Sequence, residues 1–369
     1  MPSAAPELCI VVPTFNERDN IAELVRRLCR VLAAIDWEVV FVDDDSPDGT
    51  TEQVHALGAA DHRVRCIRRI RRRGLSSASI EGMLSTSATF VAVMDADLQH
   101  DESLLPAMVE LLRKGGDDRG PDLVVASRYV GSGAVTGLSS NRRRWLSRAG
   151  TRLARLLLKT EVTDPVSGFF MLRRAVIDAV APRLSGVGTK ILIDILASSP
   201  RPLRVVELPY LFRPRHAGES KLDTLTALEY GLLLAEKAGG PYISHRLLLF
   251  GLVGASGIVI NLTVLRLLLA LAAEPIRSVT AATIVAMVWN FFLNNMLTYR
   301  DRRLTGWRAL RGLLLFMAIC GLGALINIAI FRELYAATRM WLPAGIAGAL
   351  IGALLNYGLT SIFTWGSRP

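Results

Sequence analysis

Two aspartates one residue apart follow an apolar run in the segment FVAVMDADLQH, residues 90–100. The run Phe90–Met94 is expected to be a buried strand, and Asp95 and Asp97, two apart in an extended chain, point to the same side. Two hard oxygen ligands on one side suit Mg²⁺ or Mn²⁺, which completes its shell with water and phosphate oxygens. An isolated D-x-D tripeptide is usually a pair of solvated loop acids, so the position at a strand end is what supports a metal site.

Similar polar clusters follow other apolar runs in the first half of the chain. The runs are Leu8–Val12, Trp37–Val42, Phe90–Met94 and Leu123–Ala126, with segments of helical period such as 20–34 and 103–113 between them. Apolar strands alternating with helices predict an α/β fold with a mostly parallel, Rossmann-like sheet covered on both faces. In such sheets ligands bind beyond the carboxyl ends of the strands. The clusters expected there are PTFNE (13–17), DDDSPDGT (43–50), DADLQH (95–100) and SRY (127–129).

Charge and hydropathy divide the chain of 369 residues into two parts. A formal charge of +10 is combined with 51% hydrophobic residues, and from about Arg246 to Trp365 the chain is mostly Leu, Ala, Ile, Val and Gly. This asymmetry predicts a soluble domain, residues 1–230, followed by a membrane domain, residues 243–366. The four cysteines form no CxxC or Cys/His cluster, which favours a reducing compartment over a zinc site or a disulfide framework. We expect no signal peptide, and therefore a cytoplasmic soluble domain.

Four apolar segments in the last third each reach the length of about 20 residues that spans a bilayer. They are expected at 246–272, 279–298, 311–331 and 343–364. The connection Tyr299–Arg311 holds five arginines, whereas the connections 273–277 and 333–341 hold one each. By the positive-inside rule the middle connection, and with it both ends of the unit, lies on the cytoplasmic side.

A helix with an arginine stripe is expected at about 140–158. Arg144, Arg148, Arg152 and Arg155 recur at steps of four, four and three, and apolar residues occupy another face. This pattern fits a helix at an anionic lipid surface, and it also fits a surface helix on a soluble core. A second, more apolar interfacial candidate spans 222–238. No recognised binding module accompanies the arginines, so nucleic acid is not expected as a partner.

The order of several motifs resembles one enzyme family. The motifs are PTFNE, DDDSPDGT, DADLQH, ASRY, RRRWLSR, DPVSGFFMLRR and RHAGESKL. In this order they resemble the family 2 inverting glycosyltransferases of the GT-A fold, and among these the dolichol-phosphate mannose synthases, over residues 7 to about 230. The last third resembles a GtrA-type membrane domain of four helices, chiefly through NFFLNNMLTYR.

The resemblance implies roles for individual residues. Those that match the nucleotide-sugar site are Pro13, Phe15, Glu17, Val42, Asp44, Asp95, Ala96, Asp97, Gln99, Lys190, Arg215 and Lys221. Those that match the acceptor-phosphate site are Arg128, Arg142 and Ser139. The implied metal ligands are Asp95, Asp97 and Gln99, with Asp97 and Gln99 ranked first, and the implied catalytic residues are Asp97, Arg128 and Asp95. A helix-capping acid at Glu17 and solvated cations at the basic positions are the plain alternatives.

Two stretches need separate interpretation. The family commonly has Gly-Leu-Gly after the third strand, whereas here Ser76 stands at the second glycine, which affects how closely that backbone can approach a donor. The stretch DPVSGFF, residues 164–170, resembles a turn that shapes the acceptor site, and Asp164 has no assigned chemical role. His100 is not expected to touch the metal.

The implied activity is transfer of mannose from GDP-mannose to a polyprenyl (dolichyl-type) monophosphate, with inversion. Since the phosphate acceptor is already an anion, no side chain has to act as its base. One alternative is the same reaction with UDP-glucose or another nucleotide sugar. Another is a lipid-linked sugar flippase with a regulatory nucleotide-sugar domain, suggested by the polar residues within the spans. Those residues are Asn261, Arg266, Asn290, Asn294, Asn295 and Asn327.

Overall fold

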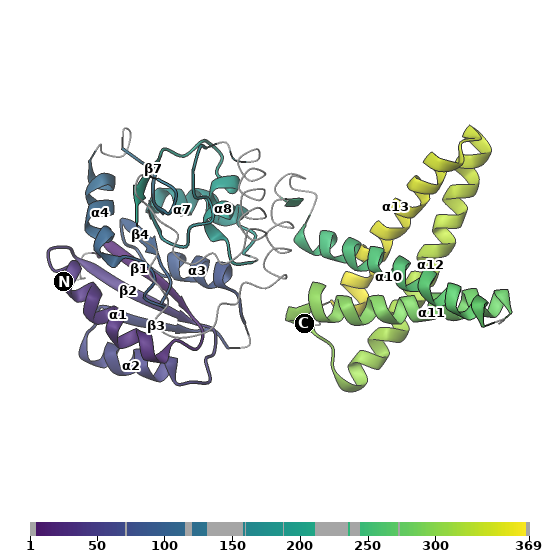
Figure 1. The fold of residues 1–369 in the computed structure, drawn as a ribbon, viewed down its shortest axis with the longest axis horizontal. Coiled ribbons are helices and arrows are strands. Elements are labelled where there is room, and N and C mark those ends of the chain that lie inside the picture. Colours follow the sequence, from purple (N-terminus) through teal and green to yellow (C-terminus); the bar gives the residue numbers. More distant parts are fainter. Residues whose placement is uncertain are drawn as a thin grey trace. The chain divides into compact units, whose positions relative to one another are not determined.

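The computed structural model describes residues 5–70, 72–114, 120–130, 158, 160–186, 188–210, 235–236, 244–271 and 274–366. The chain divides into two compact units, Met1–Gly240 and Pro241–Pro369 (Figure 1). The interfacial helices expected at 140–158 and 222–238 lie outside the described residues, apart from Leu158 and residues 235–236.

The described part of the first unit contains one sheet of seven strands in the order β3-β2-β1-β4-β6-β5-β7. The strands are β1 (Leu8–Thr14), β2 (Trp37–Asp43), β3 (Val64–Arg68), β4 (Phe90–Val93), β5 (Leu123–Ser127), β6 (Phe170–Arg173) and β7 (Val205–Pro209). Strand β6 is antiparallel to both neighbours, and the other pairs are parallel. The predicted α/β fold with a mostly parallel sheet is confirmed, and the four predicted apolar runs are β1, β2, β4 and β5.

Strand β6 was not predicted from the sequence. The stretch 164–170 resembles a turn, and its last residue, Phe170, begins β6, where it pairs with Val93 on one side and with Val125 on the other. Four residues are too few for an alternation pattern to mark a strand between two neighbours. The consequence is functional, because β6 inserts the turn around Asp164 between the ends of β4 and β5.

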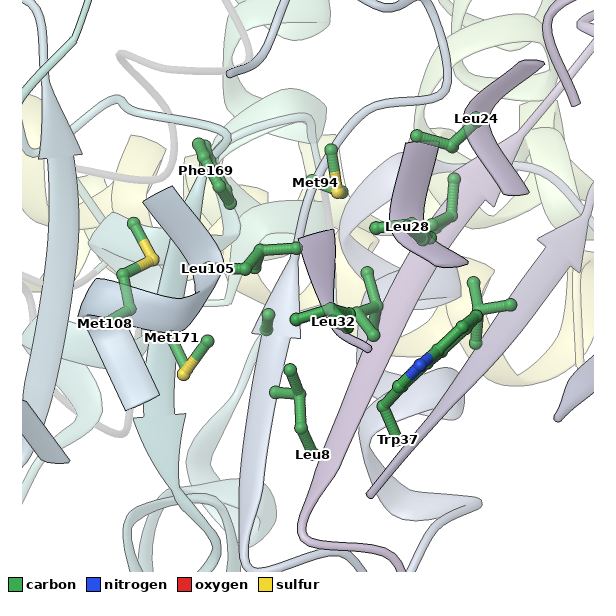
Figure 2. Packing of buried hydrophobic residues seen from close by; sticks show 14 of the residues in the cluster. Leu8, Leu24, Leu28, Leu32, Trp37, Met94, Leu105, Met108, Phe169 and Met171 are labelled. Carbon is green, nitrogen blue, oxygen red and sulfur yellow. The ribbon is translucent and has the colours of Figure 1, made fainter. Parts of the chain in front are cut away.

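Helices cover both faces of the sheet (Figure 1). They are α1 (Arg18–Val31), α2 (Thr50–Ala60), α3 (Leu75–Leu84), α4 (Leu105–Arg113), α7 (Arg174–Val180) and α8 (Ile191–Ser198). Alternate strand residues feed two separate apolar clusters, since Leu8 and Ile10 pack with α1 and α4, whereas Cys9 and Val11 pack with α3, α7 and α8. Figure 2 shows the first cluster, with Trp37 beside the leucines of α1. A sheet buried on both faces is rigid, and its strand ends are therefore well positioned to carry a site.

The second unit contains, among the described residues, four helices long and apolar enough to span a membrane. They are α10 (His245–Ala270), α11 (Pro275–Leu293), α12 (Gly306–Thr338) and α13 (Trp341–Leu359). Helices α11 and α13 each continue into a π-helical turn, Asn294–Thr298 and Thr360–Thr364. The four predicted spans are confirmed, although α12 begins before the predicted residue 311 and extends beyond 331. Most of these helices' surface is apolar and exposed, as a lipid-facing unit requires.

In the helix pairs α10–α11 and α12–α13, a glycine determines how closely the two helices approach each other. A Cβ on Gly257 of α10 would lie 2.3 Å from Oδ1 of Asn290 in α11, and a Cβ on Gly323 of α12 would lie 2.1 Å from Oδ1 of Asn356 in α13. In both pairs an asparagine side chain therefore lies against a glycine of the neighbouring helix.

We predict that Gly257→Ala and Gly323→Ala each lower the unfolding temperature of the purified chain, because each forces an asparagine away from its helix partner. The expected cost is about 1–3 kcal/mol. Matched controls are Gly254→Ala and Gly321→Ala, where a Cβ meets nothing within 4 Å. Thermal unfolding in detergent measures the effect, and equal behaviour of all four variants would contradict the packing described.

Candidate active site

The carboxyl ends of β1, β2 and β4 lie side by side at one edge of the sheet, because these strands are parallel neighbours. Just beyond each strand a described non-glycine residue has a positive φ: Asn16 (60°), Asp45 (59°) and Leu98 (62°). Such conformations are uncommon and gather at functional sites. The chain therefore turns sharply at three adjacent strand ends, and their polar segments meet at one edge.

Five of the residues predicted for the nucleotide-sugar site lie at or just beyond the ends of β1 and β2, and they are Pro13, Phe15, Glu17, Val42 and Asp44. The register pairs Pro13 with Val42. The backbone N–H of Glu17 donates to the Thr50 hydroxyl (3.1 Å), which ties the loop after β1 to the start of α2. The ring of Phe15 lies 4.2 Å from the guanidinium carbon of Arg73, a distance typical of a cation–π contact.

Two adjacent aspartates at the end of β2 have different surroundings. Asp43 is fully buried and accepts hydrogen bonds from three hydroxyl groups, so it stabilises the loop itself. Asp44, the predicted site residue, accepts from the N–H of Gly74 (2.7 Å), and its Oδ1 lies 3.0 Å from Nε of Arg69. Burial raises the pKa of Asp44. Through Gly74 this carboxylate holds the loop before α3 next to the ends of β1 and β2.

Ser76, at the position where the family commonly has glycine, is buried at the start of α3. Its backbone N–H donates to the carbonyl of Gly188 (3.2 Å), so this amide is bound within the protein. Its hydroxyl oxygen is buried and has no hydrogen-bond partner among the described residues. The serine thus joins the loop before α3 to the loop that carries Lys190.

Asp95 is oriented by His100. The backbone N–H of Asp95 donates to Nδ1 of His100 (3.1 Å), which leaves the proton of a neutral imidazole on Nε2. That nitrogen lies 3.6 Å from Oδ2 of Asp95. The buried imidazole is stacked on Phe169 at 5.3 Å and meets the edge of Tyr210 at 6.1 Å. His100 therefore acts as a positioning residue beneath the partly exposed Asp95 carboxylate.

Asp97 is more buried than Asp95 and closes the tight turn that follows. Its Oδ1 accepts the N–H of Gln99 (3.1 Å), across Leu98 with its positive φ. Leu98 is buried in the first apolar cluster, which compensates the strained backbone. Ala96 between the acids is buried in the same cluster. The three predicted metal ligands therefore lie in one turn fixed from below by packing.

Gly168 forms one wall beside Asp95. A Cβ at this position would lie 3.2 Å from Oδ2 of Asp95 and 3.3 Å from Cε1 of His100. The glycine lies in the turn before β6, and this turn therefore approaches the acid pair closely. No side chain larger than hydrogen fits there without moving Asp95 or His100.

Arg128, at the end of β5, is held by Asp164 from the same turn. Nε of Arg128 donates to Oδ2 (2.7 Å) and Nη2 to Oδ1 (2.8 Å), and the arginine's backbone N–H also reaches Oδ2 (3.2 Å). Asp164 is fully buried, whereas the Arg128 side chain is 21% exposed. Burial acts to lower the pKa of Arg128, and the hydrogen bonds with Asp164 outweigh it and raise that pKa. Asp164 thus has a definite role that its sequence did not reveal, which is to orient a cation.

Glu207 of β7 supports this pair from behind. Its carboxylate accepts the backbone N–H groups of Thr163 and Asp164 and the hydroxyl of Thr163. The backbone that presents Asp164 is therefore itself bound.

Lys190 precedes α8 and lies near the same charges. Burial, and secondly the positive charge of Arg128, lower the pKa of Lys190, while Asp95 and Asp164 act in the opposite direction. Within the described part of the chain its ammonium group has no hydrogen bond or ion pair. Since no counter-ion among the described residues contacts this buried cation, its environment suits an anionic ligand.

Four predicted residues, Ser139, Arg142, Arg215 and Lys221, lie outside the described residues. The others are brought to one edge of the sheet, with acids at the end of β4 and cations at the ends of β5 and the loop before α8. Sequence analysis missed His100, Gly168 and Asp164 as supports of this arrangement.

Asp95 and Asp97 are the candidate ligands for a divalent metal ion. Among the described residues no group of three or more His, Cys, Asp and Glu side chains is arranged to bind a metal. Mg²⁺ commonly takes only one or two carboxylates and fills its shell with water and substrate phosphates. Asp95 and Asp97 supply carboxylate oxygens in one turn, and the charge of Asp95 acts on the nearby Lys190, so the pair fits that kind of site.

Comparison with known proteins identifies the family. Residues 9–181 match the model of glycosyl transferase family 2, and residues 249–365 match the GtrA/DPMS transmembrane domain. A dolichol-phosphate mannosyltransferase of Pyrococcus furiosus is 33% identical over 98% of this chain and 100% of its own length. The chain belongs to glycosyl transferase family 2. It is a membrane-spanning glycosyltransferase of the type to which these relatives belong.

Two further similarities each cover about two thirds of the chain. A dolichol-phosphate mannosyltransferase of Saccharomyces cerevisiae is 33% identical and covers 66% of this chain and 91% of that protein. Crystal structures of glucosyl-3-phosphoglycerate synthase from Mycobacterium tuberculosis cover 64% of this chain and 81% of theirs, with 19% identity and a TM-score of 0.48.

We predict that Gly168→Ala reduces glycosyl transfer about tenfold, because the added methyl group displaces the Asp95 carboxylate by a few tenths of an ångström. The unfolding temperature should change little. Steady-state rates at varied Mn²⁺ concentration measure the effect, and an unchanged rate would show that Asp95 is not positioned as described.

We predict that Asp164→Asn destabilises the soluble unit by about 3 kcal/mol, because Arg128 loses its buried counter-charge. It should also weaken use of the acceptor while leaving nucleotide binding intact. The matched control is Asp178→Asn, whose carboxylate pairs with Arg174 on the surface and is 58% exposed. Chemical denaturation and nucleotide titration together check this, and equal stability of the two variants would contradict it.

Proposed function

We propose that this glycosyltransferase moves mannose from GDP-mannose to a polyprenyl (dolichyl-type) monophosphate, releasing GDP and forming a β-linked lipid-phosphate sugar. The observation that supports this most is the match to the Pyrococcus furiosus dolichol-phosphate mannosyltransferase, which extends through both units. A soluble transferase would need no membrane unit, whereas an isoprenoid acceptor remains in the bilayer.

The donor is proposed to lie across the ends of β1, β2 and β4. Its nucleoside would occupy the loops of Phe15, Glu17 and Asp44, and its diphosphate would lie beside the acid pair. Asp95 and Asp97 would hold Mg²⁺ or Mn²⁺ together with Gln99. When bound, this metal supplies positive charge for the departing diphosphate.

The acceptor phosphate is proposed to bind near Arg128 and Lys190. Asp164 fixes the orientation of Arg128, because two of its nitrogen atoms donate to that carboxylate. The positive charges of Arg128 and Lys190 can then offset the repulsion between two approaching phosphate groups. Ser139, Arg142, Arg215 and Lys221 are proposed to complete these phosphate contacts.

The chemical step is then a direct displacement with inversion. An acceptor phosphate oxygen forms a bond to the anomeric carbon while the bond from that carbon to the donor diphosphate breaks, and the electron pair leaves with GDP. No side chain removes a proton, because the attacking oxygen is already charged. The protein contributes position and charge, and His100, Asp164 and Gly168 contribute indirectly through Asp95 and Arg128.

The catalytic unit is proposed to face the cytoplasm. The connection between α11 and α12 holds Arg300, Arg302 and Arg303, and Arg308 and Arg311 follow in the first turns of α12. This is the basic loop of the unit, which the positive-inside rule assigns to the cytoplasmic side. Four spans return the chain to the side on which it entered.

A donor panel tests the proposal. Purified protein in detergent with polyprenyl phosphate and Mn²⁺ is given GDP-mannose, UDP-glucose, UDP-galactose and GDP-glucose in separate reactions. We expect nucleotide release coupled to lipid product with GDP-mannose at least tenfold above the others. Release of UDP from UDP-glucose at the higher rate would replace the proposed donor, and transport of a preformed lipid-linked sugar without any transfer would replace the proposed reaction class.

We also predict that Asp97→Asn lowers transfer by about 100-fold or more, because one of the negative charges that bind the metal is removed. The control Asp101→Asn removes a neighbouring carboxylate that caps a short helical turn by accepting the N–H of Ser103. Binding of Mn²⁺ followed by electron paramagnetic resonance gives a readout besides activity. Normal Mn²⁺ affinity in Asp97→Asn would contradict the assignment.

A further inference from the structure

The membrane unit repeats itself with a shift of 66 residues. The sequence LLLF at 247–250 recurs at 313–316, and further identities follow in the same register. These identical pairs are Gly257 and Gly323, Ile260 and Ile326, Asn261 and Asn327, Arg266 and Arg332, Asn290 and Asn356, and Thr298 and Thr364. Residues 245–302 therefore align with residues 311–368 without a gap.

The local structure repeats in the same register. Helix α10 buries Phe250, Val253 and Gly257, and α12 buries their counterparts Phe316, Ile319 and Gly323. The π-helical turns Asn294–Thr298 and Thr360–Thr364 are also 66 residues apart. A π-turn is rare, so two in matching positions are a strong sign of a common origin.

Hydrogen bonds at the two π-turns correspond as well. The side chain of Asn294 donates to the carbonyl of Asn290 (2.9 Å), and at the matching position the hydroxyl of Thr360 donates to the carbonyl of Asn356 (2.6 Å). Each turn is closed by the N–H of the aromatic residue that follows it. The two turns thus use different side chains for the same bond.

The contacts between the two halves follow two-fold symmetry, since each contact recurs between the equivalent residues with the halves interchanged. Phe291 of the first half meets Phe316 of the second at 5.8 Å, and their counterparts, Tyr357 and Phe250, meet at 5.5 Å. Tyr299 and Trp365 are counterparts of each other, and their rings stack at 4.2 Å with an interplanar angle of 5°. In an isologous interface a residue on the axis meets its own equivalent, as these two do.

We infer that the membrane unit is a tandem duplication of one helical hairpin, α10–α11 and α12–α13, joined as an internal dimer through a self-complementary surface whose partner is its own copy. The axis passes between Tyr299 and Trp365. Since four successive spans alternate in direction, both hairpins have the same orientation and the axis follows the membrane normal. The asparagines against Gly257 and Gly323 are then a symmetric packing pair, and their presence needs no transport path.

The two halves differ in the hydrogen bonds made by the stacked rings of Tyr299 and Trp365. Trp365 donates from its indole nitrogen to Oδ1 of Asn295 (3.1 Å), whereas the counterpart of Asn295 is Ser361. This difference makes the duplication testable. By the two-fold relation, a tryptophan at position 299 should form the equivalent hydrogen bond only if Ser361 is also replaced by asparagine.

The first experiment uses grafts in the full-length chain. Residues 247–266 are replaced by a copy of residues 313–332, and in a control by a copy of residues 314–333, which shifts the same sequence by one position. We expect the first graft to insert, purify and unfold within a few degrees of the original chain, as followed by circular dichroism. The shifted graft should lose at least ten degrees or fail to fold. Equal behaviour of the two grafts, whether both fold or both fail, would overturn the inference.

A second set of variants tests the axis itself. Tyr299→Trp and Trp365→Tyr should each lower the unfolding temperature, since each leaves the stacked pair with the wrong volume. The double variant with Ser361→Asn added should recover most of that loss, while Ser361→Asn alone should change nothing. Additive losses without recovery would contradict a two-fold relation between these positions. Membrane insertion and unfolding are read without any glycosyl transfer, so the outcome is independent of the proposed donor and acceptor.

Discussion

Parallel pairing of β1 with β2 and β4 is the constraint on which the site depends. The pairing carries three chain segments to one edge in fixed register, and the apolar clusters on both faces keep the strands from sliding. The polar residues beyond the strands can then adopt strained conformations at Asn16, Asp45 and Leu98, because the buried strands hold the chain on both sides. The acids of β4 take their position from this arrangement.

The antiparallel strand β6 adds the second half of the site. It lies between β4 and β5 and brings one turn against both, so that Gly168 touches Asp95 while Asp164 binds Arg128. The acids proposed to bind a metal and the cation proposed to bind a phosphate are thereby joined through the backbone of residues 164–168. A displacement of this turn would disturb both, which links the geometry of the donor to that of the acceptor.

Much of the fold follows from simple periodicity. Apolar runs predicted β1, β2, β4 and β5, because a strand buried on both faces has few polar positions. Four long apolar segments predicted the membrane spans for the same reason, since lipid surrounds them. Short β6 has no such signal, and the ion pair between Arg128 and Asp164 joins residues whose proximity depends on it. The proposed duplication is visible in LLLF and the asparagines, and the mean hydropathies of the four spans, 2.2, 1.5, 2.5 and 1.6, alternate in the same way.

The central claim is that one edge of the sheet holds a metal-bound nucleoside diphosphate between the acid pair and the cations. Diffraction from crystals with GDP and Mn²⁺, recorded at the manganese absorption edge, tests it most directly. We predict an anomalous peak about 2.1 Å from a carboxylate oxygen of Asp97 or Asp95, with the diphosphate bound beside the acid pair at the same metal ion. A manganese peak away from both aspartates, with the diphosphate bound elsewhere, would contradict it.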